Sequence, residues 1–228
     1  MRLYLIFVLF CGSAVFAQDT IPNFSAIDSL YREDQFYMGI SYNLLQNRND
    51  GIRQNKISYG ITGGFLRDMP INARRNFSIA AGLGYSFQNY NQNILVSKKD
   101  NVYSYSTIDP AAPFNKNKVQ THAIELPIEI RWRTSNAESH KFWRVYTGFK
   151  VGYVFYDVSK YEGSQGKFVY TNNPDISKVN YTVYTALGYN TWNATVSYGI
   201  NPIFENGNLN GNPIKLNALS LGLLFYIL

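Results

Sequence analysis

Residues 77–88, FSIAAGLGYSFQ, decide the fold class, because two kinds of side chain alternate along them with a period of two. One set carries the large apolar side chains: Phe77, Ile79, Leu83, Tyr85 and Phe87, with the small Ala81 among them. The other set holds only Ser, Ala, Gly and Gln. Successive side chains of a β-strand point to opposite faces of the sheet. The stretch therefore predicts a strand with one apolar face and one small, polar face.

The same alternation recurs along the chain, in segments that are rich in Tyr, Phe, Ile and Val and are broken by Asn, Gly, Asp and Pro. The strands expected from it are 35–46, 55–66, 76–90, 118–133, 142–158, 179–190, 193–204 and 214–228. After residue 17 no apolar run reaches 18 residues, so no transmembrane helix is expected. The pattern predicts an all-β protein of eight strands.

The weaker face of these segments collects glycines and charges, and this feature indicates what surrounds the sheet. Small residues and charges cannot fill a soluble core to native density. They suit the narrow lumen of a barrel whose apolar face meets lipid, and in lipid only helices and closed barrels satisfy every backbone group. We therefore predict an eight-stranded antiparallel transmembrane (outer-membrane) β-barrel, with a soluble, lipocalin-like barrel as the alternative. Eight strands leave an interior that side chains fill, so no pore is expected.

The composition of the 228 residues excludes other classes of protein. Charged residues make up 16% and aromatic residues 16%, and the mean hydropathy is −0.21. A bundle of membrane helices would have a clearly positive mean hydropathy, and a disordered chain would have few aromatic residues. The net charge of +6 is mild and scattered along the chain, so nucleic acid is not expected as a partner.

The N-terminus has the pattern of a secretory signal. Arg2 is followed by an apolar run and then by a small-residue cleavage site, so we expect residues 1–17 to be removed after Ala17. Lipidation at Cys11 is the alternative, although Phe10 precedes it. Residues 18–34 would form a short periplasmic segment and 35–228 the barrel. Cleavage would remove Cys11, which is the chain's single cysteine, and no cofactor or metal site is expected.

The expected connections alternate in length. Loops 47–54, 91–117, 159–178 and 205–213 would face outward, and the shorter turns together with both ends of the barrel would face the periplasm. One of these turns is basic. Its residues Arg67, Asp68, Arg74 and Arg75 could form either a solvated turn or a docking surface for a protein partner.

Charges on the inward face of segments 118–133 and 142–158 predict a lumen ion-pair network. Its members are Glu125, Glu129, Arg131, Arg133, Arg144 and Lys150. A turn centred near residue 138 gives partner numbers that sum to 275, which places Glu125 opposite Lys150. A structural plug and a proton or ion path are both compatible with such a network. Pro127 removes a ladder hydrogen bond, so a local bulge is expected there.

No catalytic constellation is apparent. His122 has the parity of the lipid-facing Ile124, so it should point outward, away from Glu125. His140 lies in the expected periplasmic turn, where neighbours in sequence do not make a triad. The sequence therefore predicts a protein that is not an enzyme.

Several stretches are similar to the PorT family of outer-membrane proteins from Bacteroidetes. They are YMGISYNLL (37–45), RDMPIN (67–72), GLGY (82–85), THAIELPIEIRWRTS (121–135), KFWRVYTGFK (141–150) and GY (152–153). This resemblance implies an integral outer-membrane component of the type IX secretion system, which supports gliding motility in some members. It implies protein partners and no catalytic residues. The end of the chain, Phe225-Tyr226-Ile227-Leu228, departs from the terminal aromatic residue of many outer-membrane barrels.

The function expected from the sequence is thus that of a non-enzymatic outer-membrane barrel that serves protein secretion through contacts with other envelope proteins. A small structural or adhesive barrel whose outer loops bind a ligand is the second hypothesis, and a lipid-modifying enzyme is the third. The expected surroundings are outer-membrane lipid in every case.

Overall fold

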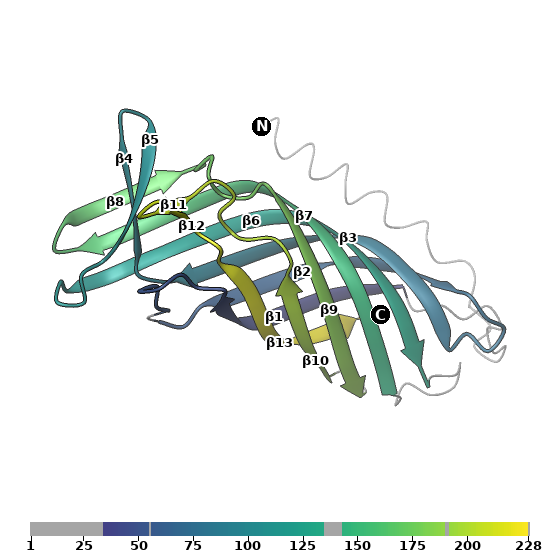
Figure 1. Cartoon of the computed structure of the whole chain (residues 1–228). Coiled ribbons are helices and arrows are strands. Elements are labelled where there is room, and N and C mark those ends of the chain that lie inside the picture. Colours follow the sequence, from purple (N-terminus) through teal and green to yellow (C-terminus); the bar gives the residue numbers. More distant parts are fainter. Residues whose placement is uncertain (1–33, 55, 135–142, 190–191, 228) are drawn as a thin grey trace, which may run out of the picture. The chain divides into compact units, whose positions relative to one another are not determined.

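The computed structural model describes residues 34–54, 56–134, 143–189 and 192–227 (Figure 1). The predicted signal peptide with its cleavage site, residues 18–33 and His140 lie outside the described residues. Eight long strands form the main sheet: β1 (Gln35–Gln46), β2 (Tyr59–Pro70), β3 (Phe77–Asn91), β6 (Phe114–Arg133), β7 (Trp143–Gly163), β9 (Val179–Tyr189), β10 (Trp192–Gly199) and β13 (Asn217–Ile227). Within the described ranges, no helix is long and apolar enough to cross a membrane.

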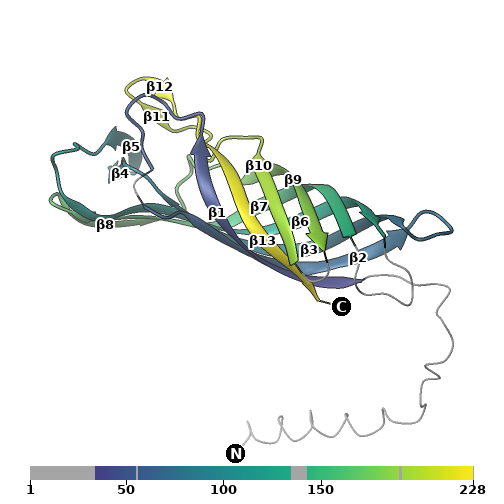
Figure 2. The same ribbon diagram turned by 90° about the horizontal axis from the view of Figure 1, so that it is seen from below.

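The eight strands close into a ring. Their order is β1-β2-β3-β6-β7-β9-β10-β13, and β13 returns to β1 through an antiparallel ladder from Phe36↔Ile227 to Gln46↔Asn217 (Figure 2). Every neighbouring pair in the ring is antiparallel. The predicted fold class, a closed eight-stranded antiparallel barrel, is confirmed. Closure leaves no free edge within the ring, so backbone polar groups are satisfied without water.

The outer surface of the barrel is an apolar band. Large side chains of the predicted lipid-facing set are exposed on it, among them Phe36, Ile40, Ile61, Leu83, Ile128, Ile130, Tyr153, Leu187, Val196 and Leu221. Between Trp132 and His122 on β6, ten residues at ~3.3 Å each and a strand tilt of ~40° give a height of about 25 Å. This is the height of the apolar band of outer-membrane barrels.

Aromatic side chains border the apolar band at both ends. Near one end, the rings of Trp143 and Tyr189 and those of Trp192 and Phe225 lie 5.1 Å apart. Near the other, the ring of His122 lies 5.0 Å from that of Phe87 and 5.5 Å from that of Tyr156. Aromatic residues gather at both interfaces of a membrane barrel, so these two belts mark where the lipid begins and ends.

The lumen side of the barrel is packed too tightly for side chains at some positions. A Cβ added at Gly82 would collide with the carbonyl oxygen of Phe65, and one added at Gly84 would collide with the hydroxyl of Tyr37. The narrow interior therefore requires glycine at these two positions.

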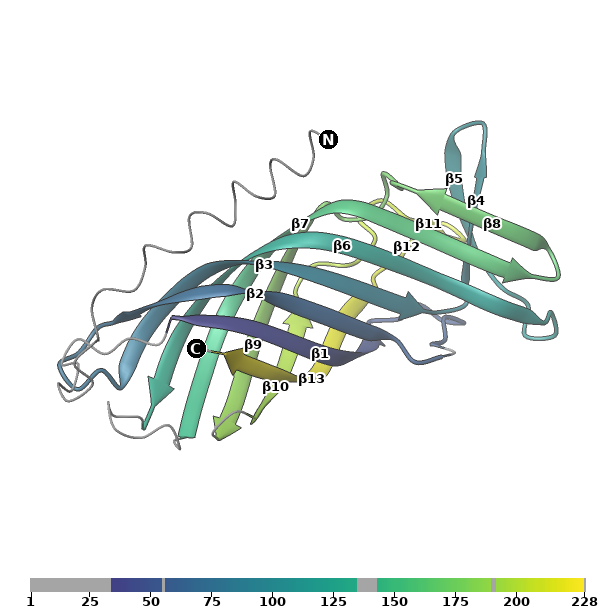
Figure 3. The ribbon, with the colours of Figure 1, turned by 180° about the vertical axis from the view of Figure 1, so that it is seen from behind.

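Beyond the barrel, the long connections carry five further strands: β4 (Ile94–Lys99), β5 (Val102–Thr107), β8 (Gly166–Thr171), β11 (Asn208–Leu209) and β12 (Asn212–Pro213). Strand β8 pairs with the outer part of β7, whereas β4, β5, β11 and β12 form a second sheet. Figure 3 shows β6, β7 and β8 continuing together past the ends of the neighbouring strands. The loops expected at 91–117 and 159–178 thus contain hairpins: β4 pairs with β5, and β8 pairs with the outer end of β7.

The outer segments other than β8 share a hydrophobic core, and we call them the outer cap (residues 47–54, 56–58, 92–113, 172–178 and 200–216). The core joins cap residues to the outer ends of barrel strands: Leu45, Ile52, Tyr90, Ile94, Val96, Tyr105, Val119, Ile176, Phe204, Leu209, Ile214 and Leu216. At its centre, the Tyr105 hydroxyl donates to Asp175 and accepts from Asn173, both over 2.8 Å. Burial raises the pKa of Tyr105, so its hydroxyl stays protonated and can donate.

Two local expectations also need correction. The second strand is β2 at Tyr59–Pro70 rather than 55–66, so residues 67–70 continue a ladder with β3 instead of turning. At Pro127 no bulge forms: pairing with β3 lapses between Ala81↔Ile128 and Gly84↔Glu125, and the register is unchanged across the gap. Proline lacks only its backbone N–H donor, so the ladder can omit the hydrogen bond there without a change of register. Register shifts lie instead at Phe114/Lys116 and at His122/Ala123, between β6 and β7.

The cap core supports a prediction about local stability. Phe204 is 2% exposed and packs edge-on against Tyr105. We expect Phe204→Ala to destabilise the cap by about 3–5 kcal/mol and to expose its lysines to trypsin, while the barrel keeps its heat-resistant gel mobility. Limited proteolysis with electrophoresis measures both. Val169→Ala, at an exposed position of β8, is the control and should leave the cleavage rate unchanged. Equal cleavage of both variants would contradict a common core.

Candidate functional site

Buried charges fill the lumen at the end that carries the short connections, which in outer-membrane barrels faces the periplasm. We call this group the charged plug. Its members are Asp68, Glu129, Arg131, Arg133, Arg144, Tyr146, Tyr184 and Tyr226. They point inward from β2, β6, β7, β9 and β13. Arg131, Arg133 and Tyr146 are each 0% exposed, so water does not reach these side chains.

Asp68 connects two arginines of β6 to β2. Its Oδ1 lies 3.3 Å from Nη1 of Arg131, and its Oδ2 lies 2.9 Å from Nη2 of Arg133. The hydroxyl of Ser78 donates to the same carboxylate over 2.6 Å. Each oxygen of the Asp68 carboxylate is therefore paired with a guanidinium group. A buried carboxylate needs such a partner, because an unpaired buried charge is strongly destabilising.

Glu129 is the second carboxylate that contacts Arg131. The Nε of Arg131 donates to its Oε2 over 2.7 Å, and the Tyr184 hydroxyl donates to its Oε1 over 2.6 Å. The Arg131 guanidinium also lies 4.7 Å from the ring centroid of Tyr146, and Arg144 lies 5.8 Å from that of Tyr226. Cation–π contacts of this kind gain strength where water is excluded. The plug is thus one connected network across five strands.

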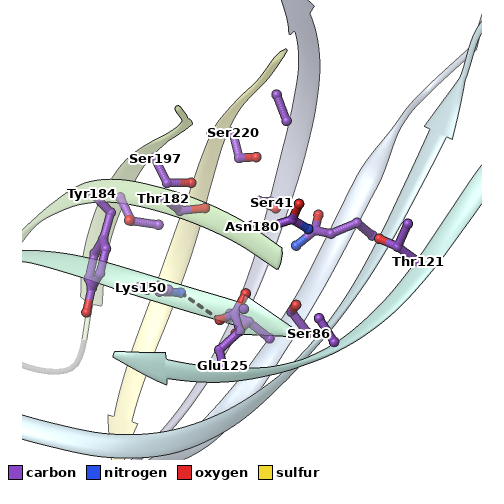
Figure 4. Close-up of a pocket in the computed structure, with 18 of the residues that line it drawn as sticks. Ser41, Ser86, Thr121, Glu125, Lys150, Asn180, Thr182, Tyr184, Ser197 and Ser220 are labelled. Carbon is purple, nitrogen blue, oxygen red and sulfur yellow. Dashed lines mark hydrogen bonds and ion pairs between the residues drawn. The ribbon is translucent and has the colours of Figure 1, made fainter. Parts of the chain in front are cut away.

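Next to the plug, the lumen widens into a polar chamber of about 110 Å³ (Figure 4). Hydroxyl and amide side chains line it, among them Ser41, Ser86, Thr121, Asn180, Thr182, Ser197 and Ser220. A single ion pair crosses its wall, with Nζ of Lys150 3.2 Å from Oε2 of Glu125. A cavity of this size and polarity has room for a few water molecules. Gly152 lines the chamber as well, and a Cβ there would meet nothing closer than 3.7 Å.

The six residues of the predicted lumen network all point inward, but their pairing differs from the expectation. Between Ala123 and Arg133, the partner numbers of β6 and β7 sum to 277 rather than 275, so Glu125 lies opposite Gly152 and Lys150 opposite Pro127. Glu125 reaches Lys150 diagonally, and Glu129 pairs with Arg131. A shift of two residues keeps every side chain on its face, which is why hydrophobic alternation cannot detect it.

The structure places the four residues of the expected basic turn in different environments. Asp68 is 0% exposed and belongs to the charged plug, so it cannot be part of a docking surface. Arg67 points outward from strand β2 and not from a turn. Arg74 is exposed in the connection between β2 and β3, and the carbonyl of the half-buried Arg75 accepts a hydrogen bond from Nε of Arg133.

His122 lies on the outside of the barrel, where its Nδ1 is 2.6 Å from the Tyr85 hydroxyl. It belongs to the outer aromatic belt. Across the described part of the chain, no group of three or more His, Cys, Asp or Glu side chains is placed to hold a metal ion.

Sequence reasoning missed Asp68 and the three tyrosines of the plug. Asp68 has the parity of Gly60, Thr62 and Gly64, so extending the expected strand 55–66 by two residues would have found it. Tyr184 shares the parity of Thr182 and Gly188, so alternation places it on the inward face, but no local pattern identifies its partner. Its contact with Glu129 spans 55 residues and depends on the closure of the ring.

The closed ring, the apolar band and the charged lumen define an integral β-barrel of the outer-membrane type. The family model described as "Outer membrane protein beta-barrel domain" matches residues 16–205, and the chain belongs to this family. Its location is accordingly the bacterial outer membrane. No curated protein sequence matches the chain.

Solved structures with some likeness are outer-membrane barrels at low identity. The crystal structure of Ail, the attachment invasion locus protein of Yersinia pestis, with the heparin analogue sucrose octasulfate is 10% identical and has a TM-score of 0.39; the match covers 86% of this chain and 99% of that one. Ail in a phospholipid nanodisc is 14% identical, with coverages of 86% and 100% and a TM-score of 0.36. A Rh. blastica porin mutant is 10% identical, with coverages of 86% and 100% and a TM-score of 0.20. The fold assignment rests on the strand pairings and the family match.

The charged plug predicts a large effect from removing one partner. Arg131→Met leaves Glu129 without its guanidinium partner and Asp68 with one guanidinium fewer, so we expect the free energy of unfolding to fall by about 3–5 kcal/mol. Urea unfolding in micelles, followed by tryptophan fluorescence, measures it. Adding Glu129→Gln to Arg131→Met should recover part of the loss.

Glu125→Gln is the matched control, because Glu125 is 14% exposed and its partner Lys150 faces the chamber. We expect this change to cost about 1 kcal/mol. Equal losses for Arg131→Met and Glu125→Gln would show that the plug is no more important to stability than the chamber pair.

Proposed function

We propose that this protein is a non-enzymatic, non-conducting component of a protein secretion machinery, and that it acts through contacts with other envelope proteins. The observation that carries the proposal is the charged plug. Eight strands leave little space inside a barrel, and here buried arginine and tyrosine side chains fill the periplasmic end of it. A barrel that is blocked in this way must work through its surfaces.

The resemblance to the PorT family supports the more specific proposal, in which the machinery is the type IX secretion system and its associated gliding apparatus. The organised outer cap and the exposed periplasmic Arg74 are two surfaces that other envelope proteins could contact. In this proposal the barrel anchors and positions partner proteins at the outer membrane, and the exported proteins pass elsewhere.

A second candidate function is that of a structural or adhesive barrel with a ligand at its outer loops. The extension of β6, β7 and β8 beyond the outer aromatic belt favours it, because a sheet holds a binding surface more rigidly than loops do. For this function the cap would bind the ligand, and no periplasmic surface would be involved.

The plug predicts that the protein conducts no ions. Reconstituted in planar bilayers, the purified chain should give no stepwise current, because Arg131, Arg133 and Tyr146 leave no continuous aqueous path at the periplasmic end. Current recordings after insertion, with insertion verified by protease protection in matched liposomes, measure this. Stable open steps would overturn the non-conducting proposal.

The secretion proposal predicts that cells lacking this protein retain exported proteins. Quantification of cell-associated and released cargo measures the defect, and crosslinking from native membranes should capture envelope partners. Arg74→Glu should weaken this crosslinking by removing an exposed periplasmic charge, whereas Lys99→Glu, at the tip of β4, serves as the control. Normal release of cargo from cells that lack the protein would refute the secretion role and leave the adhesive one.

A further inference from the structure

Lysines gather on one face of the sheet that β6, β7 and β8 form beyond the barrel. Lys118 of β6 lies directly opposite Lys160 of β7. Glu162 of β7 lies opposite Lys116 of β6 on one side and opposite Lys167 of β8 on the other. We call these four lysines the lysine patch. Lys56 lies at its rim, where its Nζ donates to the carbonyl of Asn115 over 2.5 Å.

The lysine patch continues the face of the barrel that meets lipid. Along β6, Lys116 and Lys118 share the parity of His122, Ile124 and Ile128, and their inward neighbours Asn117 and Val119 are buried. On the opposite face of the extension, Tyr161 and Phe168 stack with ring centroids 5.8 Å apart and pack against the outer cap. The cap therefore covers one face of this sheet, and the lysines occupy the other.

The height of the lysine patch places it next to the membrane surface. Lys118 is four residues beyond His122 of the outer aromatic belt, which at ~3.3 Å per residue and a ~40° tilt corresponds to about 10 Å along the barrel axis. The polar headgroup region adds several ångströms beyond the hydrocarbon on each side of a bilayer. A lysine side chain can extend toward the headgroups from this level.

The charge of the lysine patch is not balanced by the protein. Glu162 pairs with Lys116 over 3.2 Å, in an exposed position where such a pair contributes little. Within the described residues, the structure gives no ion pair to Lys118, Lys160 or Lys167. Burial, and after it the neighbouring Lys160 and Lys116, lower the pKa of Lys118, which lies outside the membrane-crossing part of β6. Like charges placed opposite each other destabilise a sheet, so an external anion would stabilise this one.

We propose that the lysine patch binds the phosphate groups of lipid headgroups in the outer leaflet. Four observations converge on this ligand: the face is continuous with the lipid-facing band, it lies at headgroup height, it carries excess positive charge, and its ammonium groups can each contact a phosphate. The outer leaflet of a bacterial outer membrane is built of phosphorylated glycolipid, which supplies several phosphates per molecule. This lipid contact is independent of the secretion role proposed above and would hold the β6–β7–β8 sheet against the membrane.

The test is lipid binding by the purified full-length protein in detergent, measured by native mass spectrometry with diphosphoryl lipid A as the probe. Each lysine near an anionic lipid surface contributes about fivefold to the affinity, so Lys118→Gln combined with Lys160→Gln should weaken binding about 25-fold. The matched control combines Lys99→Gln with Lys215→Gln, two exposed cap lysines away from the patch, and should stay within about twofold of the wild type.

Several results would overturn the proposal. They are equal affinity of the wild type for dephosphorylated lipid A, competition by inorganic phosphate at concentrations equal to those of the lipid, and unchanged lipid affinity of the double variant. Retained lipid affinity together with lost crosslinking to an acidic envelope protein would likewise overturn it in favour of protein docking. The heat-shifted gel mobility of each variant verifies that it has folded. A salt titration of the wild type provides a second measurement, in which lipid affinity should fall as ionic strength rises.

Discussion

The absence of water inside the membrane is the constraint on which this structure depends. In hydrocarbon every backbone N–H and C=O group must find a partner within the protein, and β-strands achieve this only when the sheet closes on itself. Here the ladder between β1 and β13 makes that closure. Eight strands then leave a narrow interior, where Gly82 and Gly84 have no room for a side chain and where every buried charge needs a partner. The charged plug is a consequence of closure, since Arg131, Arg133 and Tyr146 are packed and paired inside a narrow ring.

Much of the barrel could be predicted from the sequence, because a single periodicity reports it. The strands of the ring, the apolar outer face and the inward orientation of Glu125, Glu129, Arg131, Arg133, Arg144 and Lys150 all follow from alternation with a period of two. The register does not follow, since sums of 275 and 277 place the same residues on the same faces. The charges and the proline around Asp68 predict a turn, whereas its parity with Gly60, Thr62 and Gly64 places it in the lumen. Pairing partners within the plug depend on which strands meet across the ring, and no local pattern carries that information.

The outer cap was harder to predict, for a different physical reason. Its core is assembled from short pieces that are far apart in the sequence, such as Ile52, Ile94, Ile176 and Phe204, and none of them shows a long periodic pattern. One local signal was present. Asp100 and Asn101 both adopt positive φ, 50° and 63°, in the two-residue connection between β4 and β5, and Asp and Asn tolerate this conformation better than most residues. The polar composition of residues 91–117 suggested a loop, whereas the chain uses the same residues for a hairpin and for the outer part of β6.

The distribution of charge separates the structural part of this molecule from the part that faces its surroundings. In the plug and the chamber, four cations (Arg131, Arg133, Arg144 and Lys150) accompany three carboxylates (Asp68, Glu125 and Glu129), so this part of the lumen is nearly neutral and its charges hold strands together. The excess positive charge of the chain must therefore lie mostly outside the lumen, and the lysine patch concentrates part of it just beyond the outer aromatic belt. A cation inside the barrel costs stability unless a carboxylate accompanies it, whereas a cation at the membrane surface finds its counter-charge in the lipid. The same alternation that hides Arg131 from solvent thus presents Lys118 to it, thirteen residues and therefore one change of parity away along a single strand.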